Sequence, residues 1–224
     1  MIDHIIDNNK DFEAKKGYEN YLTDKYLERR QESDNTTSGT QFIDLGLPSG
    51  TLWADRNIGA NDPEDYGEYF RWGETTPFYE DSYVYDYLDL GDNIAGTEYD
   101  VATAILGKDY KMPTDEQLKE LLHCCSWERT AINDVKGMKV TGPNGNNIFL
   151  PAAGFCYNNS CRLADVGSGG HYWTSMHGDF PDYTYTGIHL NFNSHFCIWA
   201  MCDRGGGLSV RPVLTGNHVS DTSC

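Results

Sequence analysis

Two short stretches in the middle of the chain carry hydrophobic residues at helical spacing. The first covers residues 99–106 and ends at Gly107, a residue typical of a helix C-terminal cap. The second begins at Thr114, and Gln117 three residues later completes the pattern of a capping box. Its apolar residues follow the i, i+3, i+4, i+7 rule and are Leu118, Leu121, Leu122 and Cys125. The pattern therefore predicts two short helices.

Alternation of hydrophobic and polar residues predicts short strands towards the C-terminus. Ile188, Leu190 and Phe192 alternate with polar residues, which is typical of a half-buried strand. We expect these three side chains to point inward, with His189 and Asn191 on the other side.

A tight turn at residues 193–194 leads into a second strand, residues 196–201, that is apolar at every position. Because successive side chains point to opposite faces, only one alternate set is expected to face the core. We expect Trp199 and Met201 to point outward. Glycines then end this strand, and residues 208–211 are predicted to form the last one.

The N-terminal residues 1–38 have apolar side chains largely at helical spacing, with nine acidic and six basic residues. This predicts an amphipathic helical arm that ends in a polar linker. Because an isolated helix is marginal in water, we expect residues 1–33 to dock on the body or on a partner subunit of an oligomer. The main domain is expected over residues 39–215, and residues 216–224 are expected to be a flexible tail.

Composition refines the fold class. Aromatic residues make up 13% of the 224 residues, and there are 23 glycines. Such a chain is typical of short antiparallel strands joined by long Gly-rich loops, and with two helices it predicts an α+β fold. Five large aromatic residues are expected in the core: Trp53, Phe70, Trp72, Phe149 and Trp173.

The net charge of −17 narrows the range of partners. An acidic surface repels phosphate backbones, so no nucleic-acid binding is expected. Residues 39–110 hold 15 acidic and three basic residues, so the acidic belt and any recognition face are expected to be different surfaces. No apolar run approaches the roughly 20 residues of a membrane-spanning helix, so no membrane insertion is expected. No signal peptide is visible in the first residues.

Residues capable of chemistry form no recognisable signature. Histidines and cysteines gather between residues 171 and 202, but their spacing matches no zinc motif. A lectin-type calcium site needs oxygen ligands on both sides of a proline, and residues 180–182 lack the first of them. Carboxylates over residues 64–81 are more typical of a solvated acidic face than of a glycosidase pair. We therefore predict no catalytic residue, no metal and no cofactor.

Seven sequence blocks, in this order, carry a resemblance to a known family. They are FIDLGLPSGTLWADRNIGA (42–60), EDYGEYFRWGET (64–75), KMPTDEQLKELL (111–122), VKGMKVTGPNGNNIFLPAAG (135–154), YWTS (172–175), LNFNS (190–194) and LSVRPV (208–213). They resemble the paralogous surface domains abundant in gut Bacteroidetes, first named as the Fibrobacter succinogenes major paralogous domain. The resemblance covers residues 42–214 and implies a C-type-lectin-like fold, which the predicted N-terminal helical arm precedes.

Residues 176–206 depart from the pattern of that family. Large aromatic residues, Met and Cys stand where relatives carry runs of Asn, Ser and Tyr. This resembles the variable proteins of diversity-generating retroelements, whose C-terminal lectin-like domain is randomised at adenine-rich codons. Each residue in 195–204 is one that an AAC or AAG codon with scrambled adenines encodes. A second buried layer is the structural alternative for the same residues.

The resemblance implies a non-enzymatic recognition domain that binds a protein or a glycan on another cell or particle. Large aromatic residues, Met and Arg give a large contact area per residue at modest ordering cost. The predicted ligand-binding residues are His177, Tyr183, Tyr185, His189, His195, Phe196, Trp199, Met201, Asp203 and Arg204. Display on a virion or a cell surface is the favoured localisation.

Two alternatives stay open. The first is a surface adhesin or pilus-type domain without a diversified site. The second is an oxidase of the formylglycine-generating type, a family that shares the lectin-like fold and a comparable helix start. That activity depends on a reactive cysteine pair in the region of Cys197 and Cys202, where the flanking residues do not match.

Overall fold

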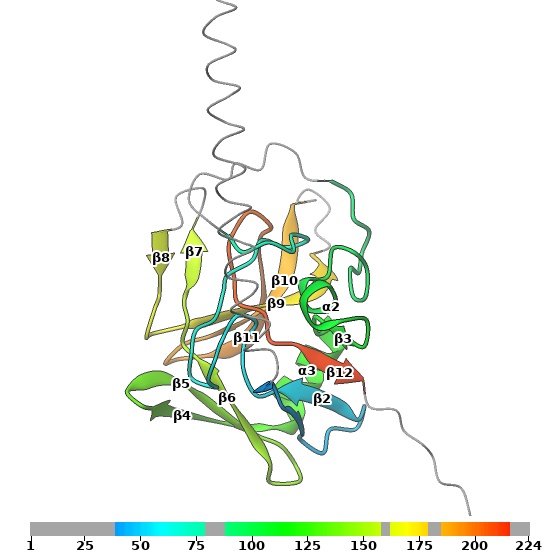
Figure 1. Ribbon diagram of the computed structural model, residues 1–224. Coiled ribbons are helices and arrows are strands. Elements are labelled where there is room, and N and C mark those ends of the chain that lie inside the picture. Colours follow the sequence, from blue (N-terminus) through cyan, green and yellow to red (C-terminus); the bar gives the residue numbers. More distant parts are fainter. Residues whose placement is uncertain (1–38, 79–87, 158–161, 179–184, 216–224) are drawn as a thin grey trace, which may run out of the picture. The chain divides into compact units, whose positions relative to one another are not determined.

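The first and last strands of the domain lie in one small sheet (Figure 1). The computed structural model describes residues 39–78, 88–157, 162–178 and 185–215. In hydrogen-bonded order, this sheet contains β1 (Phe42–Asp44), β2 (Thr51–Ala54), β12 (Val213–Thr215) and β3 (Tyr110–Lys111). Every pairing in it is antiparallel, so the end of the domain closes against its beginning.

Among the described residues, the remaining strands form three more antiparallel groups. The first is β11-β10-β9, with β9 (Gly170–His177), β10 (Thr186–Phe192) and β11 (Cys197–Asp203). The second is β4-β5-β6, with β4 (Ser126–Ile132), β5 (Val135–Thr141) and β6 (Asn147–Pro151). The third pairs β7 (Phe155–Tyr157) with β8 (Arg162–Ala164).

Two helices are present in the described residues, where the hydrophobic pattern predicts them. α3 (Asp115–Cys124) begins with the predicted capping box: Gln117 N donates to Thr114 Oγ1 over 3.2 Å, and Thr114 N donates to Gln117 Oε1 over 2.9 Å. α2 (Val101–Leu106) starts two residues later than expected, because the Asp100 carboxylate caps it by accepting from Ala102 N and Thr103 N. Gly107 caps its C-terminus, as predicted.

Buried side chains form two hydrophobic clusters, which we call core 1 and core 2. The buried residues of core 1 are Leu45, Leu47, Trp53, Leu118, Leu121, Met138, Val140, Ile148, Leu150, Ala152, Tyr172, Leu190, Phe192 and Val213. Those of core 2 are Ile58, Phe70, Trp72, Ile94, Val101, Ala102, Met112, Trp173, Leu208 and Val210. Consecutive residues of β9, Tyr172 and Trp173, belong to different cores, so each face of the β11-β10-β9 sheet packs against one of them.

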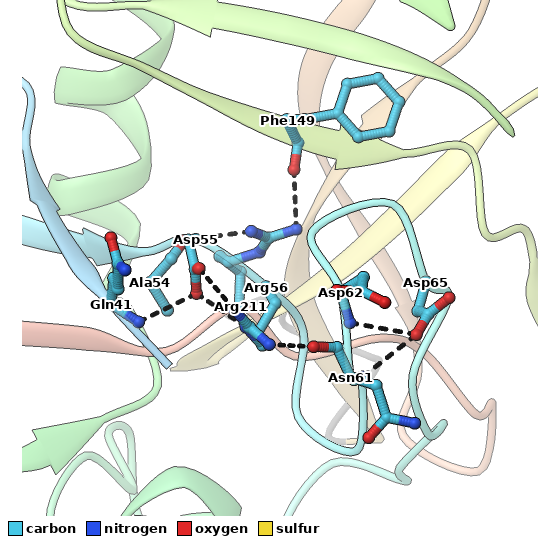
Figure 2. Close-up of polar contacts among 9 residues, drawn as sticks. All are labelled: Gln41, Ala54, Asp55, Arg56, Asn61, Asp62, Asp65, Phe149 and Arg211. Carbon is cyan, nitrogen blue, oxygen red and sulfur yellow. Dashed lines mark hydrogen bonds and ion pairs between the residues drawn. The ribbon is translucent and has the colours of Figure 1, made fainter. Parts of the chain in front are cut away.

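A buried arginine joins distant parts of the chain around core 1. The two Nη groups of Arg211 donate to the carbonyls of Ala54 and Phe149 over 3.0 and 2.9 Å (Figure 2). Its Nε donates to Asn57 Oδ1 over 2.9 Å. All three hydrogen bonds go to amide or carbonyl oxygens rather than to a carboxylate. Burial lowers the pKa of Arg211 to about 10. The neighbouring carboxylate of Asp55 instead forms a 2.8 Å ion pair with Arg56.

These small antiparallel sheets and two helices confirm a mixed α+β class for the described residues. The five aromatic residues predicted for the core are all buried: Trp53, Phe70, Trp72, Phe149 and Trp173. The predicted last strand, residues 208–211, is wrong. Residues 207–209 form isolated bridges, and the last strand is Val213–Thr215, because Pro212 precedes the segment that pairs with β2 and β3.

Three predictions concern other parts of the chain. The helical arm of residues 1–38 and the tail of residues 216–224 lie outside the described residues, and so does Tyr183. They stay predictions.

Candidate recognition surface

The hairpin that joins β10 to β11 is built around the predicted turn. Asn193 N donates to Phe196 O over 2.9 Å, which closes a loop of two residues. The Asn193 side chain stabilises the same loop, since its Oδ1 accepts from His195 N at 2.8 Å and from Phe196 N at 3.3 Å. An Asn at this position satisfies backbone donors that a tight turn leaves free, so the local sequence specifies where the chain reverses.

The register of the hairpin determines which side chains share a face. Ile188, Leu190 and Phe192 stand opposite Met201, Trp199 and Cys197 in turn. Residues directly opposite each other in an antiparallel pair point to the same face. Cys197, Trp199 and Met201 therefore lie on the face that carries Leu190 and Phe192 of core 1, and α3 packs on that side.

Strand β11 is exposed on both faces in its middle. The side chain of Trp199 is 46% exposed on the core 1 side, and that of Ile198 is 46% exposed on the other side. Phe196 in the turn is 40% exposed. Trp199 and Met201 were expected to point away from the core face, and Ile198 towards it. The register reverses this assignment: Trp199 and Met201 lie on the core 1 side and Ile198 on the other. Trp199 is nevertheless exposed, because β11 is the edge strand of its sheet. Alternation alone did not identify Ile198, because a strand that is apolar at every position is typical of burial on both faces.

The structure brings several predicted residues together on this hairpin. His195, Phe196, Trp199 and Asp203 are exposed along β11 and its turn, and Met201 is half-buried among them. Tyr185 is 49% exposed and lies at the far end of β11, where its carbonyl accepts from Arg204 N over 2.8 Å.

His177 lies at the end of β9, opposite Gly187 of β10. It is half-buried, with its ring 6.1 Å from that of Trp72 in an edge-on arrangement. This places His177 beside core 2, at the margin of the exposed hairpin rather than in its centre.

His189 is wrongly predicted as a ligand-binding residue. It points away from Leu190, as expected, but that side of β10 is covered by core 2, and the residue is only 3% exposed. Its ring stacks on that of His171 at 5.5 Å and meets Trp173 edge-on at 5.8 Å. Burial, together with the neighbouring His171, lowers the pKa of His189 to about 3, so the ring is neutral at ordinary pH.

Arg204 is also wrongly predicted as a ligand-binding residue. It is 5% exposed, and its guanidinium lies 4.5 Å above the ring of Trp72, which is a cation–π contact. Its Nη1 donates to the carbonyl of Leu88 over 3.1 Å. Arg204 therefore links the end of β11 to Leu88 and to core 2. Its aliphatic stem and planar guanidinium can pack against an indole ring and be buried there.

The cysteines of β11 do not form a reactive pair in this geometry. Cys197 and Cys202 are five residues apart on one strand, so their side chains point to opposite faces. Cys197 packs against core 1 and Cys202 against core 2. Burial raises the pKa of the Cys197 thiol to about 12 and that of Cys202 to about 11, which disfavours the nucleophilic thiolate.

The described residues contain neither a candidate metal site nor a candidate membrane-spanning helix. No group of three or more His, Cys, Asp or Glu side chains in this part of the chain is arranged to hold a metal ion. None of the helices described has the length and apolar character needed to cross a membrane.

Comparisons with protein families, with curated proteins and with solved structures find no match for this chain. The functional proposal therefore depends on the geometry of the hairpin and on the resemblance described above.

Proposed function

We propose that this chain is a recognition protein with a C-type-lectin-like domain, and that the β10–β11 hairpin is its ligand-binding surface. The observation that carries the proposal is the run of large apolar side chains exposed in β11 and its turn. Phe196, Ile198 and Trp199 are 40–46% exposed on the edge strand and its turn, whereas most other Phe and Trp side chains of the described residues are buried. Exposed aromatic residues grouped on a rigid scaffold are typical of binding surfaces.

The arrangement of the chain supports the lectin-like part of the proposal. The first and last strands share a sheet, two short helices lie between them, and a separate sheet near the C-terminus presents the exposed hairpin. The middle of β11 contributes no buried side chain to either core of this framework. Such a framework tolerates varied residues at Ile198 and Trp199 while the cores stay constant.

We further propose that β11 is diversified by a retroelement and displayed on a virion or a cell surface. The exposed residues between 195 and 203 lie within the segment 195–204, where each residue is one that an AAC or AAG codon with scrambled adenines encodes. The first alternative, a surface adhesin, would use the same binding surface without diversifying it. The oxidase of the formylglycine-generating type is disfavoured by the opposite orientation of Cys197 and Cys202.

Sequencing the gene in many isolates tests the diversification. We expect substitutions in the codons for Phe196, Ile198 and Trp199, at the positions that are adenine in an adenine-rich copy of the segment near a reverse-transcriptase gene. The codons for Leu190 and Leu208 are the matched control, since both residues are buried and are expected to stay constant. Equal variation in both groups, or none in either, would leave only the undiversified adhesin.

A library of purified variants tests the recognition surface itself. Randomising residues 196, 198 and 199 is expected to give mostly folded proteins, with melting temperatures within a few degrees of the parent. The same randomisation at residues 173, 190 and 192, which are buried, is expected to give mostly unfolded ones. If both libraries unfold alike, the hairpin is structural and the proposal fails.

A further inference from the structure

The outer edge of β11 has no strand beside it in the described part of the chain. β11 is the end member of the sheet β11-β10-β9, and it pairs with β10 alone over all seven of its residues. An edge strand exposes a row of backbone donors and acceptors on which another strand can pair.

The hydrogen bonds at the two ends of the hairpin show which backbone groups point outward. Asn193 N donates to Phe196 O at one end, and Arg204 N donates to Tyr185 O at the other. Hydrogen-bonded pairs in an antiparallel ladder recur at every second residue. Ile198, Ala200 and Cys202 therefore turn their N–H and C=O groups towards β10.

The alternate residues of β11 turn theirs away from the sheet. These are Cys197, Trp199 and Met201, which follow each other at two-residue spacing along the outer edge. Asp203 ends this row, because its carbonyl already accepts from Gly206 N over 3.0 Å. The free edge thus offers three N–H groups and three C=O groups in the spacing of a β-ladder.

The sequence and register of β11 lack the features that usually protect an edge strand. β11 contains no Lys, no Pro and no irregularity in its register with β10, and its single charge is Asp203 at the end. Ile198 and Trp199 lie on opposite faces beside the free edge, so a strand added there would contact an apolar side chain on each of its faces. The backbone and the side chains of β11 are suited to the same kind of ligand.

We propose that β11 binds an extended segment of a partner polypeptide by adding it as a fourth strand to the β11-β10-β9 sheet. This inference rests on the proposed function and makes it more specific, because it names a peptide backbone as the ligand. Main-chain hydrogen bonds to Cys197, Trp199 and Met201 supply affinity that depends little on the partner's sequence. The side chains at 198 and 199 supply selectivity, so diversifying them changes the partner without losing the binding mode.

Charge favours a neutral or basic segment over a second copy of this chain. Each copy carries a net charge of −17, so edge-to-edge pairing of two copies brings like charges together.

Amide hydrogen exchange of the full chain provides the direct test. The probe is a synthetic seven-residue peptide of alternating valine and threonine with a lysine at each end. In the free protein, we expect slow exchange at Ala200 and Cys202 and fast exchange at Trp199 and Met201. Saturating peptide is expected to slow exchange at Trp199 and Met201, which would give protection along the whole strand.

Matched variants separate the backbone from the side chain. Trp199→Ala removes the indole and keeps the outward N–H, whereas Trp199→Pro removes both and leaves the inward bonds to β10 intact. We expect Trp199→Pro to bind the peptide at least about tenfold more weakly than Trp199→Ala, since it loses one ladder bond and blocks close approach of the strand. Melting temperatures of both variants show whether each is folded.

Several results would overturn the inference. One is equal peptide affinity of the two variants, and another is peptide that fails to slow exchange at Trp199 and Met201. A third is protection of these amides in the free protein that increases with protein concentration, because a second copy would then occupy the edge. In each case, residues 196, 198 and 199 could still tolerate randomisation. The proposed recognition surface would then remain, and only the binding by strand addition would be disproved.

Discussion

The domain contains two three-stranded antiparallel sheets that end in very different edge strands. β4 and β11 are both seven residues long, and each pairs with one neighbour in its sheet. In its middle, β4 exposes Glu128 and Arg129, whereas β11 exposes Ile198 and Trp199. Charged residues discourage another chain from pairing with an edge, and apolar residues invite it. The chemistry of the edge, rather than the topology, distinguishes the candidate recognition strand from a protected one.

The same contrast exists across one pair of neighbouring strands. Leu190 and Trp199 stand directly opposite each other on one face, yet Leu190 is buried in core 1 and Trp199 is half exposed. The boundary between scaffold and surface therefore lies between β10 and β11.

The largest expected effect is a loss of stability when a buried residue of β10 is truncated. Leu190→Ala is expected to lower the free energy of unfolding by about 2–5 kcal/mol, because it leaves a cavity in core 1. Trp199→Ala is expected to cost less, about 1–2 kcal/mol, since nearly half of its side chain already contacts water. Urea titration of the two variants measures both values. Similar losses would mean that β11 belongs to the core and that the comparison between β10 and β11 is false.

Local signals in the sequence predicted much of the scaffold. The capping box at Thr114, the C-cap at Gly107 and the turn at Asn193 depend on neighbours within a few residues, and all three are present. Alternation also placed Leu190 and Phe192 together on a buried face. These features are predictable because the residues that cause them are adjacent in the chain.

The remaining errors have one physical origin, which is that alternation assigns side chains to faces but does not show what covers a face. His189 was placed on the correct side of β10, but core 2, built from distant segments, buries that side. Arg204 was expected at the surface, and Trp72 and Leu88 bury it from more than 100 residues away. Ile198 was expected inside because nothing in the local pattern shows that β11 is an edge strand.

The second prediction is that acid destabilises the β11-β10-β9 sheet before the β4-β5-β6 sheet. His189 has a pKa of about 3 in the folded protein, below its ordinary value of 6.5. As the pH falls below 6.5, the unfolded chain gains this proton more readily than the folded one, so stability is full above pH 6.5 and falls towards pH 3. This histidine alone is expected to cost about 2–3 kcal/mol between pH 6.5 and 4.5. His171, whose pKa burial also lowers, adds to the loss, and the nearby Asp165 opposes it.

Native-state hydrogen exchange at pH 6.5 and 4.5 measures this effect on each sheet. No histidine lies in β4, β5 or β6, so the amides of β10 are expected to lose protection first. The variant His189→Gln is the control, because it keeps a polar side chain that does not titrate. If its stability falls with pH as steeply as that of the parent, His189 does not cause the loss.

The third prediction concerns how the exposed strand is held in place. Asn193→Ala removes an acceptor for two backbone N–H groups in the hairpin turn, so it is expected to cost about 1 kcal/mol. Exchange at Ala200 and Cys202 is expected to become faster, while the β4–β5 pair is unaffected. Asn193→Asp is the matched variant, since its carboxylate can accept the same bonds. Equal exchange rates in both variants would show that the turn does not position β11.

The smallest expected change in stability comes from two substitutions, one that adds a charge to the edge strand β11 and one that replaces a charge with an apolar residue in the edge strand β4. Ile198→Lys places a charge beside the free edge of β11, and Glu128→Ile removes one from the exposed middle of β4. Both side chains are exposed, so each substitution is expected to change the free energy of unfolding by about 0.5 kcal/mol or less. Their effects on association are expected to be opposite: Ile198→Lys weakens binding of the valine–threonine peptide, and Glu128→Ile makes the protein self-associate. Light scattering and peptide titration at equal protein concentration separate these outcomes. If both edges respond alike, exposed apolar residues on β11 do not mark a binding strand, and the difference between β4 and β11 has no functional meaning.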